Sequence, residues 1–171
     1  MYVCLRCEKQ LDLYTFIECA KHSINMDESP CPYCKQGSVV ELDDVIAPTV
    51  MELRRKGYET MFSCGGHWYE EMPIIQIVFL FGCDEVPDVT DLPDGFFSII
   101  IHYPFKEEDP KDVTEQLEIL CEIKAGTIPD KMTEINSRCI SLLKWAERLP
   151  TFEQASYLKE LQDGLNDKQA L

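Results

Sequence analysis

Two pairs of cysteines near the N-terminus have the residue type and the spacing of a metal site. Each pair has the form Cys-x-x-Cys, with Cys4 and Cys7 in the first and Cys31 and Cys34 in the second. A Cys-x-x-Cys turn places two thiolates around one ion, and zinc prefers four such ligands at tetrahedral corners. The 23 residues between the pairs are a common separation in zinc ribbons. The sequence therefore predicts one zinc ion held by all four cysteines.

This predicted site is structural rather than catalytic. Four thiolates fill the coordination sphere of zinc and leave no position for a water molecule. A redox role for either pair needs a thioredoxin-like βαβ context, which the sequence lacks. Gly37, just after the second pair, is expected to allow a tight turn in which backbone amides point at the sulfurs. Cys19 and His22 lie between the pairs and remain open as substitute ligands.

A second candidate site lies where a predicted strand ends, at Thr60, Ser63, Cys64, Gly65, Gly66 and His67. Cys64 could be a nucleophile with His67 as its base, although no Asp or Asn can be assigned as a third member. The same two residues could bind a second metal with distant partners such as Cys83 or His102. The glycine amides and the nearby hydroxyls could instead hold an anion, as in a phosphorylated compound or nucleotide. The alternative is that these residues have no role in binding or catalysis and only form a tight turn beside a buried Cys64.

Composition places the chain among globular proteins. It has 171 residues, 45% of them hydrophobic, with a mean hydropathy of −0.19. No stretch approaches the ~20 consecutive apolar residues that a membrane span needs, and the N-terminus lacks the layout of a secretion signal. We therefore expect a cytoplasmic protein. In that setting an odd count of nine cysteines indicates metal binding and reduced thiols rather than disulfides.

The charge is strongly acidic and unevenly distributed. The net charge is −15, and residues 70–122 contain fourteen acids but only two bases. This balance argues against a protein that grips phosphate backbones. The ribbon contributes few bases for nucleic-acid binding: Arg6, Lys9, Lys21 and Lys35. The acidic region 82–95 could bind a basic protein partner, or it could be a solvated surface; its acids are Asp84, Glu85, Asp88, Asp91 and Asp94.

The elements expected to position these residues begin with a strand over residues 37–42. A helix should follow, capped by Asp43 or Asp44, with Pro48 in its first turn and Gly57 at its end. Three strand-like runs come next, and their spacing predicts an antiparallel meander: residues 58–64, 73–81 and 96–103.

The last third of the chain is predicted to be helical. Asp109-Pro110 would open a helix with Val113, Leu117 and Leu120 on one face, ending at Gly126. Asp130 would cap a second helix that stops at Pro150. Thr151 and Gln154 form a capping box for a third. The fold class expected is α+β, in three parts: a zinc ribbon over residues 1–42, an α+β domain over 43–165 and a frayed tail over 166–171.

Several of these motifs also occur together elsewhere. The run Cys31-Pro-x-Cys34, the helix ending in Gly57-Tyr58 and the run Thr60-x-Phe62-Ser63-Cys64-x-Gly66-His67 follow in order. Over roughly residues 31–80 the chain resembles uncharacterised zinc-ribbon proteins of Gram-positive bacteria and their phages. That resemblance implies a small cytoplasmic α+β protein, phage- or mobile-element-encoded, with no assigned activity.

A fainter similarity is to the wybutosine-pathway methyltransferases, which have a Ser-Ser-Cys-Ser-Gly-Arg turn. Here Ser63, Cys64 and Gly66 match that turn, while Gly65 and His67 depart from it. Taken together, the sequence favours a non-enzymatic zinc-binding interaction or accessory protein. A ligand-binding or enzymatic site at Ser63–His67 is the alternative, and nucleic-acid binding through the ribbon is a further one.

Overall fold

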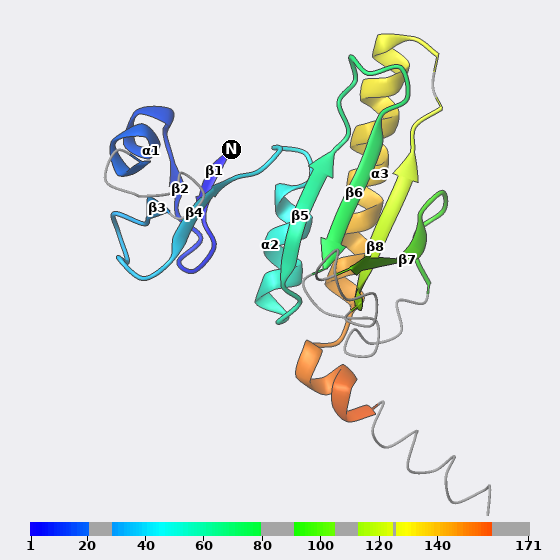
Figure 1. Ribbon diagram of the computed structural model, residues 1–171. Coiled ribbons are helices and arrows are strands. Elements are labelled where there is room, and N and C mark those ends of the chain that lie inside the picture. Colours follow the sequence, from blue (N-terminus) through cyan, green and yellow to red (C-terminus); the bar gives the residue numbers. More distant parts are fainter. Residues whose placement is uncertain (21–28, 80–90, 105–112, 125, 159–171) are drawn as a thin grey trace, which may run out of the picture.

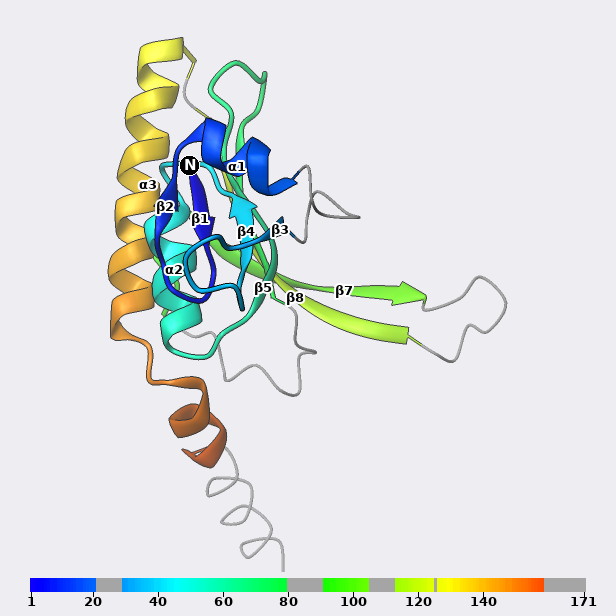
Figure 2. The ribbon, with the colours of Figure 1, turned by 90° about the vertical axis from the view of Figure 1, so that its left-hand side faces the viewer.

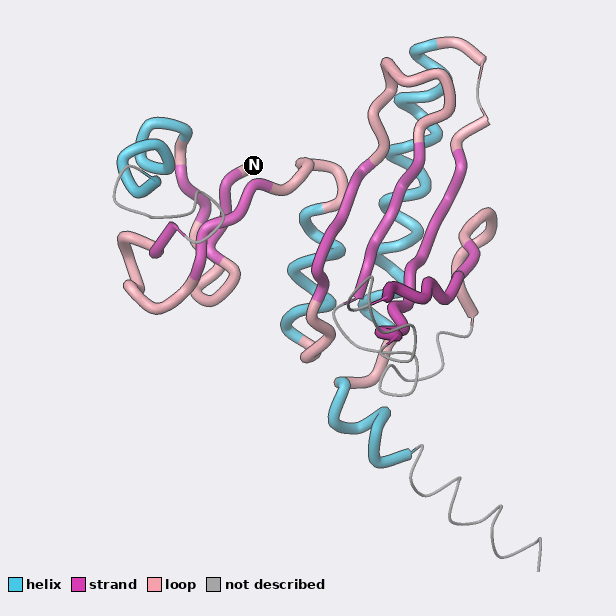
Figure 3. Tube along the Cα trace, in the orientation of Figure 1, coloured by secondary structure: helices cyan, strands magenta, loops and turns pink. Residues whose placement is uncertain are grey.

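The computed structural model describes residues 1–20, 29–79, 91–104, 113–124 and 126–158 (Figure 1). Two antiparallel four-stranded sheets are accompanied by helices, so the predicted α+β class is confirmed. Figure 3 shows the two sheets as separate groups of strands, with the N-terminal group beside the larger one. Within the described ranges, no helix is both long and apolar enough to cross a bilayer.

The N-terminal sheet has the strand order β2-β1-β4-β3. Its elements are β1 (Tyr2–Cys4), β2 (Gln10–Leu11), α1 (Leu13–Ala20), β3 (Ser29–Pro30) and β4 (Ser38–Glu41). The strand predicted over residues 37–42 is therefore β4. The apolar cluster between the cysteine pairs forms both a short strand and a helix, and Phe16 of α1 stacks on Tyr2 with ring centroids 4.2 Å apart.

The second sheet has the order β5-β6-β8-β7 and carries two helices on one face (Figure 2). Its strands are β5 (Thr60–Gly65), β6 (Ile74–Phe79), β7 (Phe97–Pro104) and β8 (Val113–Glu122). The helices are α2 (Ala47–Arg55) and α3 (Ile128–Arg148). Between these layers lies the main core, which includes Leu53, Ile77, Phe79, Leu142 and Trp145.

One predicted helix is a strand. The segment opened by Asp109-Pro110 was expected to be helical, but residues 113–122 form β8. Leu117, Ile119 and Cys121 all belong to the main core, so an apolar residue faces it at every second position, and this period of a strand outweighs the helical spacing of Leu117 and Leu120. The simple meander is also wrong, because β8 lies between β6 and β7 in the sheet.

The two C-terminal helices form as expected, with a shifted start for the first. Thr127 rather than Asp130 is the N-cap of α3, and its hydroxyl accepts from Asp130 N at 3.3 Å. The capping box is confirmed, since Thr151 N donates to Gln154 Oε1 at 3.1 Å and Gln154 N donates to Thr151 Oγ1 at 3.3 Å. A short helix follows over residues 152–158. The predicted tail, 166–171, lies outside the described residues.

The start of α2 differs from the prediction in a way that matters for the site. Its N-cap is Ile46, and no side chain caps it. Asp43 Oδ2 instead accepts from Gly65 N at 2.8 Å, and Asp44 Oδ1 accepts from the amino group of Met1 at 2.7 Å. The end of the helix is as predicted, because Gly57 has a φ of +88°. Asp43 is thus available to β5 rather than to α2.

Polar contacts join the ribbon to the second unit. The Met1 amino group, which donates to Leu42 O within the ribbon at 2.5 Å, also donates to Asp44 of the second unit. Arg55 at the end of α2 holds Glu8 of the ribbon with two hydrogen bonds, of 2.8 Å and 2.5 Å. The basic residues at the end of this helix therefore do more than complement its dipole.

Candidate metal centre

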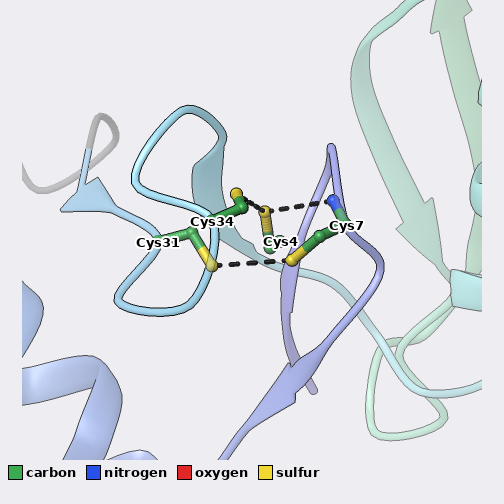
Figure 4. Close-up of side chains that lie close together, drawn as sticks. All are labelled: Cys4, Cys7, Cys31 and Cys34. Carbon is green, nitrogen blue, oxygen red and sulfur yellow. Dashed lines mark hydrogen bonds between the residues drawn. The ribbon is translucent and has the colours of Figure 1, made fainter.

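The four predicted cysteine ligands lie together between two turns of the N-terminal sheet (Figure 4). The sulfurs of Cys4 and Cys34 are 3.7 Å apart, as are those of Cys7 and Cys31. All four sulfurs lie within 4.8 Å of one another. Sulfurs held ~2.3 Å from a zinc ion at tetrahedral corners would be about 3.8 Å apart. The spacing therefore fits a tetrahedral metal ion with four thiolate ligands.

The two turns that carry the cysteines have the same local form. Glu8 follows the first pair with a φ of 60°, and Lys35 follows the second with a φ of 57°. Glu8 N donates to Cys4 O at 3.0 Å, and Lys35 N donates to Cys31 O at 2.9 Å. Because each Cys-x-x-Cys motif closes its own turn, the geometry of each half-site is local in sequence.

Backbone amides point at the sulfurs, as the sequence predicted. Cys4 Sγ accepts from Arg6 N at 3.4 Å and from Cys7 N at 3.5 Å. Hydrogen bonds from the backbone amides of Gln36 and Gly37 lower the pKa of Cys34 to about 6. Such bonds favour the thiolate form, which is the form that binds metal. The pKa of the buried Cys4 is raised to about 12, chiefly by its burial.

Gly37 is required here by space rather than by its own backbone angle. A Cβ at this position would lie 2.7 Å from Cys4 Sγ and 2.6 Å from Arg6 Cβ. Any larger residue would therefore push against the cluster.

The described cysteine side chains are all free: Cys4, Cys7, Cys31, Cys34, Cys64, Cys121 and Cys139. Thiols of the cluster are thus present in the form that a metal needs. Cys19 lies within α1, but its side chain and His22 fall outside the described residues. Their role as substitute ligands stays open.

The second candidate site contains a residue that sequence analysis missed. Cys64 Sγ of β5 lies 3.7 Å from His67 Nε2 in the following turn. Asp43, from the segment between β4 and α2, joins them, and the ligand atoms of the three residues lie within 4.8 Å of one another. The sequence did contain one indication of a role for Asp43: two consecutive aspartates, Asp43 and Asp44, precede a helix that needs only one N-cap residue. The distant partners considered earlier, Cys83 and the side chain of His102, lie outside the described residues.

The environment of Cys64 does not activate it as a nucleophile by itself. Burial raises the pKa of Cys64, and the charges of Asp43 and Glu70 raise it further, while the backbone amide of Gly66 opposes them. A catalytic cysteine needs a lowered pKa, so that the thiolate is present at neutral pH. Without a cation, this thiol stays protonated.

Four of the six candidate residues line two separate spaces. Thr60 and Ser63 line a groove of about 720 Å³ between β5 and the ribbon, together with Val40 and Phe62. Gly66 and His67 instead line a pocket of about 330 Å³. The Gly65 amide already binds the carboxylate of Asp43, at 2.8 Å. The residues predicted to bind an anion therefore do not line a single pocket.

The predicted acidic partner surface lies only in part within the described residues. Residues 82–90 of the region 82–95 lie outside the described residues. In the described remainder, Asp91 has a φ of 59°, and the carbonyl of Asp94 accepts a hydrogen bond from Arg138 of α3.

Comparisons of this chain with protein-family models, with curated proteins and with solved structures gave no match.

Proposed function

We propose that this protein is a non-enzymatic zinc-binding interaction protein, in which one structural zinc ion stabilises the fold of a ribbon that packs beside an acidic α+β domain. The spacing of the four sulfurs carries the proposal, with two separations of 3.7 Å that suit tetrahedral zinc. A set of four thiolates selects a soft or borderline ion over magnesium or calcium. The closed coordination sphere supports a role in folding rather than in chemistry.

The thin core of the ribbon supports the same role. Among the described residues of the ribbon, the buried cluster comprises Cys4, Leu11, Cys31 and Val39, and two of these are the proposed ligands. Because so little apolar surface is buried, metal binding would supply much of the folding free energy of this unit. The fully buried core of the second unit contains no described ribbon residue, and Leu42, at the end of the ribbon, packs against it; we therefore expect that unit to fold without the ion.

Metal analysis of the purified full-length chain tests the zinc site. Replacing Cys34 by serine should remove one equivalent of zinc per chain. The control is Cys121→Ala, which deletes a buried thiol outside the cluster and should leave the zinc content unchanged. Equal zinc content in the wild-type and Cys34→Ser proteins would reject the proposal.

The charge of the chain supports a basic protein as the partner. The net charge is −15, and such a field attracts a positive surface at long range. The partner would meet region 82–95 and the exposed acids of the described surface, among them Glu41, Asp44, Glu70 and Glu71.

Binding to arrays of lysine- and arginine-rich peptides tests this part of the proposal. One variant neutralises the acids of region 82–95: Asp84, Glu85, Asp88, Asp91 and Asp94. The control variant neutralises an equal number of acids elsewhere: Glu59, Glu147, Glu153, Asp163 and Asp167. Loss of binding in the first variant alone is expected. Equal binding by both variants would show that region 82–95 is not the binding surface.

One observation favours a second candidate function, nucleic-acid binding by the ribbon. The ammonium group of Lys9 lies 4.4 Å from the ring centroid of Tyr33, and this ring is 52% exposed. Arg6 and Lys35 are exposed on the same two turns. An exposed aromatic ring among bases is suited to stacking on a single strand. Fluorescence anisotropy with a labelled oligonucleotide at increasing salt would test it, and binding without salt dependence would reject it.

A further inference from the structure

We propose that Asp43, Cys64 and His67 bind a second zinc ion, in an open site with three protein ligands. This site is independent of the ribbon zinc and lies at the edge of the second sheet. It would differ from the ribbon in chemistry, because three ligands leave one coordination position for water.

The spacing of the ligand atoms fits such an ion. A sulfur ~2.3 Å and a nitrogen ~2.0 Å from a tetrahedral zinc ion would lie about 3.5 Å apart. Cys64 Sγ and His67 Nε2 are separated by 3.7 Å. A carboxylate oxygen of Asp43 lies within 4.8 Å of both atoms. Thiolate, imidazole and carboxylate together form a ligand set typical of zinc rather than of magnesium or calcium.

The backbone holds Asp43 in place before any metal binds. Gly65 N donates to Asp43 Oδ2 at 2.8 Å, which orients the carboxylate beside Cys64. A Cβ on Gly65 would lie 2.5 Å from Val45 Cγ2 and 3.2 Å from Asp43 Cβ. Glycine therefore lets the segment that carries Asp43 cross directly over the end of β5. A hydrogen bond of this kind to a ligand increases affinity by fixing its direction.

His67 is oriented by its neighbours as well. Gly66 has a φ of +84°, which turns the chain back after β5, and a Cβ there would lie 3.3 Å from Ile75 Cγ1. The imidazole of His67 stacks on the ring of Tyr69, with centroids 5.3 Å apart and planes inclined by 8°. This stacking favours one orientation of the imidazole.

The pocket of about 330 Å³ beside the site provides the open position. Asp43 and His67 both line it, and Trp68 and Ile135 form apolar parts of its wall. Glu41 and Asp44 line the same pocket, so its charge favours a cation and disfavours an anionic ligand. A bound metal ion would also counteract the raised pKa of the Cys64 thiol, because a metal deprotonates its thiol ligand.

A purely structural cluster is the competing explanation, and one substitution separates the two. Asp43→Asn keeps an oxygen that can accept from Gly65 N but removes the charge that a zinc ligand supplies. Asp44→Asn makes the same change of charge at the next residue, whose carboxylate pairs with the Met1 amino group instead. If Asp43 serves only to hold the edge of β5 through its bond to Gly65 N, the Asp43→Asn and Asp44→Asn variants should contain the same amount of zinc.

The experiment measures the zinc content of the full-length chain, purified with zinc and freed of loosely bound metal. Two equivalents are expected for the wild type and for Asp44→Asn. One is expected for Asp43→Asn and for Cys64→Ser. Cys34→Ser should keep one equivalent, which isolates the second site and distinguishes its failure from failure of the ribbon site.

Cobalt substitution provides a second readout, because thiolate ligands give the bound ion a characteristic absorption. In the Cys34→Ser protein, bound Co²⁺ should show thiolate-to-metal charge-transfer absorption, and adding Cys64→Ser should abolish it. A wild-type protein with one equivalent of zinc, together with a Cys34→Ser protein that binds neither metal, would overturn the proposal.

Discussion

The carboxylate of Asp43 accepts a hydrogen bond of 2.8 Å from the backbone N–H of Gly65, 22 residues further along the chain. This bond occupies the outer edge of β5, an edge strand of its sheet. It also places Asp43 next to Cys64 and His67. One contact thus protects a strand edge and assembles three metal-ligating side chains.

Gly65 should be intolerant of any side chain. In Gly65→Ala, the new Cβ would meet Val45 Cγ2 at 2.5 Å, and relieving that overlap should cost roughly 1–3 kcal/mol of unfolding free energy. Urea unfolding of the full-length protein measures this. Gly126→Ala is the matched control, because a Cβ there meets nothing within 4 Å, and its effect should stay within about 0.5 kcal/mol. Equal stability of the two variants would contradict the close approach.

Removing metal should unfold the ribbon but leave the second unit folded. The described part of the ribbon has a small buried cluster, whereas the second unit has a larger core, against which Leu42 at the end of the ribbon packs. After treatment with a chelator, amides of β1 and β4 should lose protection from hydrogen exchange, while those of β6 and α3 should keep it. Loss of protection in both units would show that they fold as one.

The thiols should differ in reactivity once the metal is removed. In the unfolded ribbon Cys34 should be an accessible thiol with an ordinary pKa of about 8.5, because the backbone hydrogen bonds that lower its pKa in the folded turn are lost. Burial raises the pKa of Cys139 to about 12 and also raises the pKa of Cys64, so both should react slowly. Timed alkylation with peptide mapping would rank them. Faster labelling of Cys64 than of Cys34 would contradict the protection of Cys64 by burial.

The Glu8–Arg55 pair should make docking of the ribbon sensitive to acid. The Arg55 guanidinium lowers the pKa of Glu8, so its stabilising contribution is present at neutral pH. The contribution is lost as the pH falls from the pKa of an unpaired glutamate through the lowered pKa of Glu8. The side chains are 54% and 37% exposed, which limits the effect to less than about 1 kcal/mol.

Hydrogen exchange of the ribbon in Glu8→Gln, measured against pH, tests this pair. The variant should be less protected than the wild type at pH 7 and should match it once Glu8 is protonated. Glu59→Gln, which changes an exposed acid on the other unit, should leave ribbon exchange unchanged. A pH-independent difference between Glu8→Gln and the wild type would exclude the ion pair as its cause.

Local sequence was sufficient for the four-cysteine cluster and for the ends of several elements. Each Cys-x-x-Cys motif closes its own turn through bonds between near neighbours, such as Lys35 N to Cys31 O. The capping box of Thr151 and Gln154 is local in the same sense. Residues a few positions apart determine these geometries, so the pattern alone predicts them.

Tertiary structure decided the strand β8 and the second ligand cluster. Val113, Leu117 and Leu120 are compatible with a helix, but pairing of residues 113–122 with both β6 and β7 makes this segment a strand. Asp43 had a local role available as a helix cap, yet its partner in the fold is the amide of Gly65. Both outcomes depend on hydrogen-bonding groups that a distant segment supplies. Periodicity and spacing along the chain report only near neighbours, which is why the sequence determined the ribbon's four ligands but only two of the three that meet at β5.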